Sequence, residues 1–170
     1  KKYLMRRTIM IKINSVTKKY DNFTAIENIN IDVADTSVFA LTGFNGSGKT
    51  TLLNICSGAI KPDSGQVLLD GNDVFDNDVE RQNLFYVSDN MFFPPTATVM
   101  SSAKFYATHY KNFDFDLFRS MIELFGIAPK TSIRSLSKGM KKQIQLSIGF
   151  AAKPKYLLID ETFDGLDPHK

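Results

Sequence analysis

The stretch Gly43-Phe44-Asn45-Gly46-Ser47-Gly48-Lys49-Thr50 decides the fold, because it follows the pattern G-x-x-x-x-G-K-[ST]. The apolar run at residues 38–41 precedes it and is typical of a strand buried on both faces, and a helix is expected to begin near Lys49. Glycines let the backbone curl until its N–H groups converge on one anion, and the helix start adds the positive end of its dipole. Strand, loop and helix together predict a phosphate-binding site in an α/β fold.

The residue types in this loop assign roles to single side chains. Lys49 places a positive charge on the β- and γ-phosphates of a nucleotide, and the Thr50 hydroxyl is a ligand for Mg²⁺. The alternative is a glycine-rich turn that precedes a lysine by chance, which happens in roughly one chain in a hundred of this composition. The residues expected to bind the nucleotide here are Asn45, Gly46, Ser47, Gly48, Lys49, Thr50 and Thr51.

A second chemical feature is the apolar run at residues 156–159, which ends in Asp160 and Glu161. Open α/β sheets bind ligands beyond the carboxyl ends of their strands, so Asp160 is expected to orient Mg²⁺ through its water shell. Glu161 is the candidate general base for an attacking water, which makes Glu161 and Lys49 the catalytic candidates. A pair of acids that only ends a strand is the alternative.

Other segments supply the framework. Extended patterns occur at residues 9–13, 29–33, 66–69 and 84–87. Helical patterns cover residues 98–110, 115–125 and 137–152, with Thr98 and Ser137 as expected N-caps. Strands before and after a block of helices predict an α/β domain that carries a helical insert.

Composition limits the class of protein. The chain has 170 residues, 43% hydrophobic and 23% charged, which is typical of a globular domain and excludes intrinsic disorder and collagen. Its longest apolar run, residues 144–152, is too short to cross a membrane. A net charge of +3 spread along the chain does not indicate a nucleic-acid partner. Cys56 has no second cysteine to pair with, and the first ten residues are too short for a secretory signal, so a cytoplasmic location is expected.

With Leu136-Ser137-Lys138-Gly139-Met140 just before the acidic strand, these motifs resemble the nucleotide-binding subunit of an ATP-binding cassette (ABC) transporter. The resemblance implies a P-loop NTPase with a mostly parallel core sheet, an N-terminal antiparallel β subdomain and an inserted α-helical subdomain. It places the domain at residues 9–170, the helical subdomain at about 90–135 and an extension at 1–8. The family's later strands and switch histidine have no counterpart here, so the domain is expected to be truncated at its C-terminus.

The resemblance also assigns roles that spacing alone does not. Tyr20 looks like the aromatic that stacks on adenine, and Ser137 and Gly139 look like the signature residues that contact the γ-phosphate bound by a second subunit. Lys138 and Met140 depart from the family's usual glycine and glutamine. Asp89 stands where the family has glutamine and is expected near Mg²⁺. Residues 89–98 would face the membrane subunit, or would belong to the core of the helical insert.

The function that the resemblance implies is ATP binding and hydrolysis, with ATP and Mg²⁺ as cofactors. Two ATPase subunits would associate head to tail and drive a separate transmembrane permease, from the inner face of the cell membrane. The variant signature is more similar to bacterial exporters than to importers. Two alternatives remain: a soluble ABC ATPase without a transport role, and an ATP-binding module with little turnover because the switch histidine is absent.

Overall fold

The computed structural model describes residues 9–75, 77–88 and 90–160. The chain divides into two compact units, Lys1–Arg81 and Gln82–Lys170, and each is described by itself. No helix among the described residues is long and apolar enough to cross a lipid bilayer.

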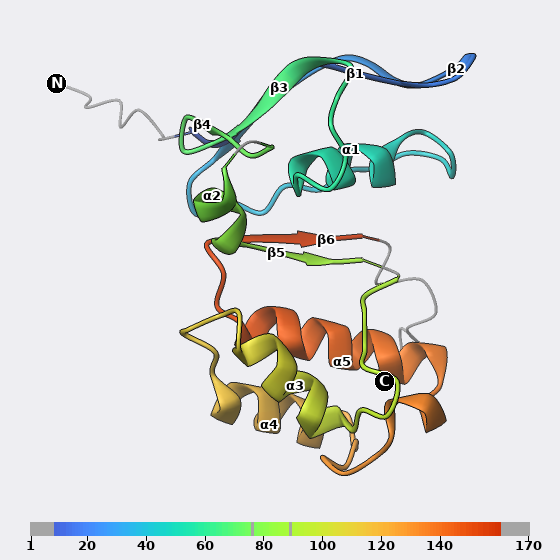
Figure 1. Ribbon diagram of the computed structural model, residues 1–170, viewed down its shortest axis with the longest axis vertical. Helices are drawn as coiled ribbons and strands as arrows, with labels where there is room; N and C mark the ends of the chain where they lie inside the picture. The colour runs from blue at the N-terminus through green and yellow to red at the C-terminus, as the bar shows by residue number, and fades with distance from the viewer. Residues whose placement is uncertain (1–8, 76, 89, 161–170) are drawn as a thin grey trace, which may run out of the picture. The chain divides into compact units, whose positions relative to one another are not determined.

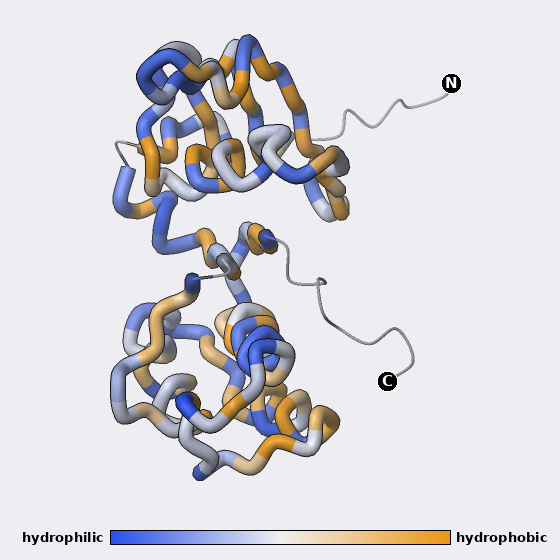
Figure 2. Tube along the Cα trace, turned by 90° about the vertical axis from the view of Figure 1, so that its right-hand side faces the viewer, coloured by the Kyte–Doolittle hydropathy of each residue, from blue (hydrophilic) through white to orange (hydrophobic). Residues whose placement is uncertain are grey.

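The first unit is built on a four-stranded antiparallel sheet of strand order β2-β1-β3-β4 (Figure 1). Its strands are β1 (Ile9–Tyr20), β2 (Phe23–Ala34), β3 (Ser64–Leu69) and β4 (Asn72–Asp73). Hydrophobic and hydrophilic residues alternate along these strands, which is the pattern of a sheet with one covered face (Figure 2). The expected N-terminal antiparallel β subdomain is therefore confirmed, although β1 extends well beyond the predicted residue 13.

Helix α1 (Lys49–Cys56) follows the glycine loop and covers this sheet (Figure 1). Leu52 and Ile55 are buried on the helix, as are Val67 and Leu69 on β3. Burial of apolar side chains of this size stabilises the unit by about 2 kcal/mol for each side chain. The core thus holds the helix whose first turn forms part of the glycine loop.

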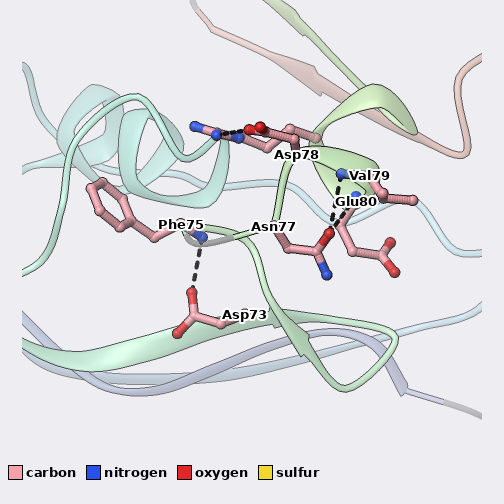
Figure 3. Close-up of polar contacts among 7 residues, drawn as sticks. Asp73, Phe75, Asn77, Asp78, Val79 and Glu80 are labelled. Atoms are coloured by element: carbon pink, nitrogen blue, oxygen red, sulfur yellow. Dashed lines mark hydrogen bonds and ion pairs between the residues drawn. The ribbon is translucent and has the colours of Figure 1, made fainter.

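The end of the first unit is organised by short side-chain caps, which Figure 3 shows. Asp73 Oδ1 accepts a hydrogen bond from the Phe75 N–H at 2.9 Å. Asn77 Oδ1 accepts from the N–H groups of Val79 and Glu80, at 3.1 and 3.2 Å. Asn77 therefore satisfies amides that the first turn of α2 (Asp78–Gln82) leaves unpaired.

The expected buried strand at residues 38–41 is wrong. These residues have no regular secondary structure, Val38 is fully exposed, and Phe39 is also exposed. A continuous apolar run becomes a buried strand only where other strands pair with it, and none of the described strands does so.

The second unit has a two-stranded parallel sheet beside a group of helices (Figure 1). Strands β5 (Leu84–Val87) and β6 (Tyr156–Ile159) pair in register from the first residue to the last. The helices are α3 (Val99–Ala107), α4 (Phe115–Leu124), the 3₁₀ turn η1 (Ile133–Ser135) and α5 (Lys138–Ala151). All three predicted helices are present, with ends within a few residues of the prediction.

Capping explains where the helices begin. The Thr98 hydroxyl accepts from the Ser101 N–H at 3.2 Å, and the Ser101 hydroxyl accepts from the Thr98 N–H at 2.8 Å, which forms a capping box. Asp114 caps α4, and Ser137 caps α5 as predicted. The core of this unit is one cluster drawn from β5 and the three helices, and the partly buried Leu157 and Ile159 of β6 pack against it. Its fully enclosed side chains include Phe85, Phe118, Ile144 and Ile148.

Candidate functional site

The glycine loop encloses the ammonium group of Lys49. Lys49 Nζ donates to the carbonyl oxygens of Gly43 at 2.9 Å and Phe44 at 3.0 Å. The Ser47 N–H donates back to Phe44 O at 3.1 Å, so the chain curls around the lysine. The positive charge of Lys49 therefore lies inside the bend of the loop.

Two glycines in the loop have backbone angles that other residues avoid. Gly46 has φ +82° and Gly48 has φ +89°. A Cβ at Gly48 would also lie 2.5 Å from both Ala25 O and Ile26 Cγ2, whereas a Cβ at Gly46 would have nothing within 4 Å. Gly48 thus allows close approach of the loop to β2, and Gly46 allows the bend on the open side.

The start of α1 fits a phosphate group. Gly48 is the N-cap and has no side chain to cap the helix, and no acidic residue occupies the first turn. The first intrahelical bond is from the Leu52 N–H to Gly48 O at 2.9 Å, so the amides of Lys49, Thr50 and Thr51 have no partner inside the helix. Free amides, a positive dipole end and an ammonium group meet here, which is the donor set that a phosphate requires.

Asp160 follows β6 in the second unit and is only 5% exposed. Its N–H donates to Val87 O at 2.9 Å, and its Oδ2 accepts from the Tyr86 hydroxyl at 3.1 Å. The carboxylate is therefore fixed at the end of the parallel pair, where α/β sheets bind ligands. Sequence reasoning missed Tyr86, because its partner lies 74 residues away.

Two of the expected Mg²⁺ ligands are among the described residues, and they belong to different units. Mg²⁺ in such sites takes one or two protein oxygens, phosphate oxygens and waters. Thr50 Oγ1 in the first unit and Asp160 in the second are oxygen donors of this kind. Among the described residues no three His, Cys, Asp or Glu side chains gather into a metal site of their own. Asp89 and Glu161, the other expected contributors, lie outside the described residues.

Ser137 and Gly139 lie at the start of α5. The Ser137 hydroxyl accepts from the Met140 N–H at 3.2 Å, so it caps its own helix, and Ser137 is exposed. Lys138 and Lys141 both fall within the first turn of this helix, which raises the positive potential that its dipole already creates. The segment presents a capping hydroxyl, a small residue and positive charge on one helix end.

Tyr20 is the last residue of β1 and is partly exposed. Lys18 Nζ lies 5.6 Å from the centre of its ring. Phe23, which pairs with Tyr20 across the turn, is exposed as well. Tyr20 is 43% exposed, and a residue that stacks on a base must be accessible.

Comparison with known proteins identifies the family. The family model described as "ABC transporter" matches residues 26–164. The ABC transporter ATP-binding protein YtrB of Bacillus subtilis is 31% identical over 158 residues, which cover 93% of this chain and 54% of that protein. The sulfate/thiosulfate import ATP-binding protein CysA of Synechocystis is 32% identical over 163 residues, 92% of this chain and 46% of that protein. The chain thus spans about half the length of these curated relatives.

Solved structures agree on the fold. CbiO1 of Clostridium perfringens, part of the ABC transporter complex cbiONQ, superimposes with a TM-score of 0.72 at 27% identity, over 95% of this chain and 69% of that chain. The dimeric structure of the ABC transporter cassette MJ0796 superimposes with a TM-score of 0.81 at 22% identity, over 94% and 77%. These neighbours confirm the expected P-loop α/β class. The chain belongs to the ABC transporter family.

Proposed function

We propose that the chain binds ATP with Mg²⁺ and hydrolyses it as the ATP-binding part of a transporter. The observation that carries the proposal is the Lys49 ammonium enclosed by the glycine loop at the open start of α1. Membership of the ABC transporter family and relatives named as ATP-binding proteins support it. The charge and the free amides in this loop match a triphosphate better than any neutral ligand.

Each residue has a separable task. Lys49 and the loop amides bind the phosphates, and Tyr20 stacks on the base. Thr50, Asp160 and Asp89 hold Mg²⁺, which neutralises charge on the β- and γ-phosphates when bound. Glu161 accepts the proton of the attacking water. Asp160 is oriented for its task by Tyr86.

The proposal extends to a second cassette. Ser137 and Gly139 of one subunit would contact the γ-phosphate held by the loop of another, because a capped helix start with extra cations attracts an anion. Two copies, or this chain and a related one, would then associate head to tail when ATP is bound. The existence of a dimeric solved cassette of the same fold supports this arrangement.

The mechanical output would pass to a membrane-spanning permease, with the ATPase peripheral on the inner face of the cell membrane. Relatives named as transporter ATP-binding proteins support a transport role over a soluble, non-transport one. Those relatives include import proteins, so they do not favour an exporter over an importer.

Binding is tested with trinitrophenyl-ATP fluorescence in the presence of Mg²⁺. Lys49→Ala is expected to weaken binding at least about tenfold, since it removes a charged donor to phosphate. Lys61→Ala is the matched control, because Lys61 lies in the same unit over the Phe75 ring, outside the loop. Equal binding by the original chain and Lys49→Ala would refute the phosphate site.

Hydrolysis and association are tested together with the variant Glu161→Gln. This variant keeps the phosphate contacts and loses the base, so ATP with Mg²⁺ is expected to hold it as a dimer on gel filtration. The original protein should dimerise only transiently as it turns over. A Glu161→Gln variant that binds ATP and remains a monomer would contradict the dimer mechanism.

A further inference from the structure

The end of the β1–β2 hairpin carries two exposed aromatic side chains. Tyr20 is the last residue of β1, Phe23 is the first residue of β2, and the two are direct partners across the turn. Phe23 is 61% exposed, more than Tyr20. Residues directly opposite each other in an antiparallel pair point to the same face of the sheet, so the two rings share one face. Tyr20 thus has a second aromatic side chain beside it.

A β-bulge in β2 determines which face the two rings share. On β1 the pairing moves on by one residue from Lys18, while on β2 it moves on by two, from Ile26 to Thr24. In a regular strand, Phe23 and Ile26 would point to opposite faces, because they are three positions apart. The extra residue of the bulge re-aims the end of the strand, so that Phe23 lies on the face of Ile26.

This face is the one next to the glycine loop. Ile26 is 7% exposed, and a Cβ placed on Gly48, the N-cap of α1, would lie 2.5 Å from its Cγ2. Phe23 is three residues along β2 from Ile26, a separation of at most about 10 Å at the ordinary rise of a strand. An extended nucleotide spans a comparable distance from its phosphates to its base. A nucleotide whose phosphates bind at the start of α1 can therefore bring its base to the aromatic pair.

The hairpin end is tied to the rest of the first unit. Lys18 Nζ lies 3.0 Å from Asp63 Oδ1 and 5.6 Å from the centre of the Tyr20 ring. Asp63 Oδ2 accepts from the Lys19 N–H at 2.6 Å, and the Asp63 N–H donates to the Thr17 carbonyl at 2.9 Å. The aromatic pair is thus held in place before a ligand arrives, which lowers the ordering cost of binding.

The chemistry of the aromatic pair selects the ligand class. Lys18, the cation on this face, is paired with Asp63, and the two rings offer flat π surfaces. Such surfaces stack on the π face of a base and read little of its hydrogen-bonding edge. A purine has a larger π face than a pyrimidine and buries more area against two rings. We propose that Phe23 contacts the base of the bound nucleotide together with Tyr20, and that the pair selects purine over pyrimidine nucleotides.

The inference rests on the proposed function, because the phosphate site at the glycine loop supplies the nucleotide whose base reaches the pair. It adds Phe23 as a specificity-determining residue, and it adds a preference among bases. The loop and the hairpin both lie in the first unit, so one titration can report on both. Pyrophosphate, which has no base, separates the contribution of the loop from that of the aromatic pair.

The test is isothermal titration calorimetry of the whole chain in Mg²⁺ with ADP, GDP, CDP and UDP, which are not substrates for hydrolysis. ADP and GDP are expected to bind within about threefold of each other, because stacking does not read the base edge. CDP and UDP should bind about tenfold more weakly than ADP, because they stack less surface on the two rings. Inorganic pyrophosphate is titrated into the same samples.

Variants at two neighbouring positions sharpen the test. Phe23→Ala is expected to weaken ADP about tenfold, CDP about threefold or less, and pyrophosphate not at all. Phe23→Tyr keeps a ring and should keep the preference for ADP. The exchange of Phe23→Thr with Thr24→Phe keeps the composition but moves the ring to the opposite face, so it should behave like Phe23→Ala. Thr24→Ala is the matched control on that opposite face and should change no affinity.

Other results overturn the proposal. An unchanged ratio of ADP to CDP affinity in Phe23→Ala would mean that the ring does not contact the base. An equal loss of ADP and pyrophosphate affinity would mean that Phe23 only supports the loop. Full ADP binding by the exchange variant would mean that the face of the strand is irrelevant. If the original chain does not bind pyrophosphate, the phosphate site itself is refuted, and this inference falls with it.

Discussion

The hydroxyl of Tyr86 on β5 donates a hydrogen bond to Oδ2 of Asp160, at the end of β6, across 3.1 Å. The parallel register aligns Tyr86 with Leu158, two residues before Asp160, and the Asp160 N–H donates to Val87 O. The strand pair thus fixes both the backbone and the carboxylate of the proposed Mg²⁺ ligand. Partners behind a metal ligand set its orientation and much of its affinity.

Tyr86→Phe is therefore expected to raise the Mg²⁺ concentration needed for half-maximal ATP binding by about tenfold. The cost to folding should be about 1–3 kcal/mol, because the variant leaves an oxygen of the buried Asp160 carboxylate without this donor. Mn²⁺ binding in the presence of ATP, followed by electron paramagnetic resonance, measures the metal directly. Tyr110→Phe is the matched control, because its hydroxyl donates to Leu84 O on the same strand and not to Asp160. Equal shifts in both variants would show that Tyr86 acts only on stability.

Alanine substitutions at two glycines of the loop distinguish the cost of backbone strain from the cost of a steric clash. Gly46→Ala is expected to cost about 1–2 kcal/mol of stability, the penalty of a positive φ alone. Gly48→Ala adds a Cβ 2.5 Å from Ala25 O, so its cost should exceed that of Gly46→Ala by at least about 2 kcal/mol. Urea unfolding of both variants measures the difference. Similar midpoints would mean that the loop moves freely away from β2.

Local signals were enough to predict the helices from sequence, because caps act within one turn. Thr98 and Ser137 are the predicted N-caps of α3 and α5, and the capping bonds are present. The glycine loop and α1 were also predictable, since positive φ, free amides and the lysine lie within eight residues. These parts need no information about distant segments.

Predictions that depended on distant partners fared less well. Residues 38–41 are apolar, yet no described strand pairs with them, because an apolar run does not specify which strand will cover it. The Tyr86–Asp160 bond and the burial of Gln145 were missed for the same reason. Asp89 and Glu161 lie outside the described residues, so their roles stay predictions.

Asp114 connects two helices, and its contacts predict that the chain loses stability in acid. The N–H of Leu117 on α4 and the ammonium of Lys153, 2.7 Å from its Oδ2, lower the pKa of Asp114 from its ordinary 3.8. When the pKa of a carboxyl is lower in the folded state than in the unfolded state, the carboxylate stabilises the fold at pH values above its unfolded-state pKa. That stabilisation is lost as the pH falls through the folded-state pKa. Asp114→Asn keeps the cap and removes the charge, so the stability of this variant should fall less below pH 4.

Urea unfolding at pH 7, 4 and 3 measures this difference. Asp116→Asn is the control, because Asp116 pairs with Arg119 on the exposed surface of α4 and connects no second helix. The Asp116 variant should follow the original chain through the whole pH range. A parallel loss of stability in the Asp114 and original chains would contradict the assignment.

Cys56 offers a direct report on unfolding of the first unit. It is 5% exposed at the end of α1, and burial raises its pKa to about 12. Only the thiolate reacts with disulfide reagents, so the native thiol at pH 8 should be protected both by burial and by its raised pKa. Leu52→Ala, which leaves a cavity beside this cysteine and costs about 2–4 kcal/mol, should accelerate labelling by at least tenfold.

Leu124→Ala, on the exposed surface of α4, should leave the labelling rate unchanged. Native labelling as fast as that in urea would show that α1 leaves the sheet without unfolding of the unit.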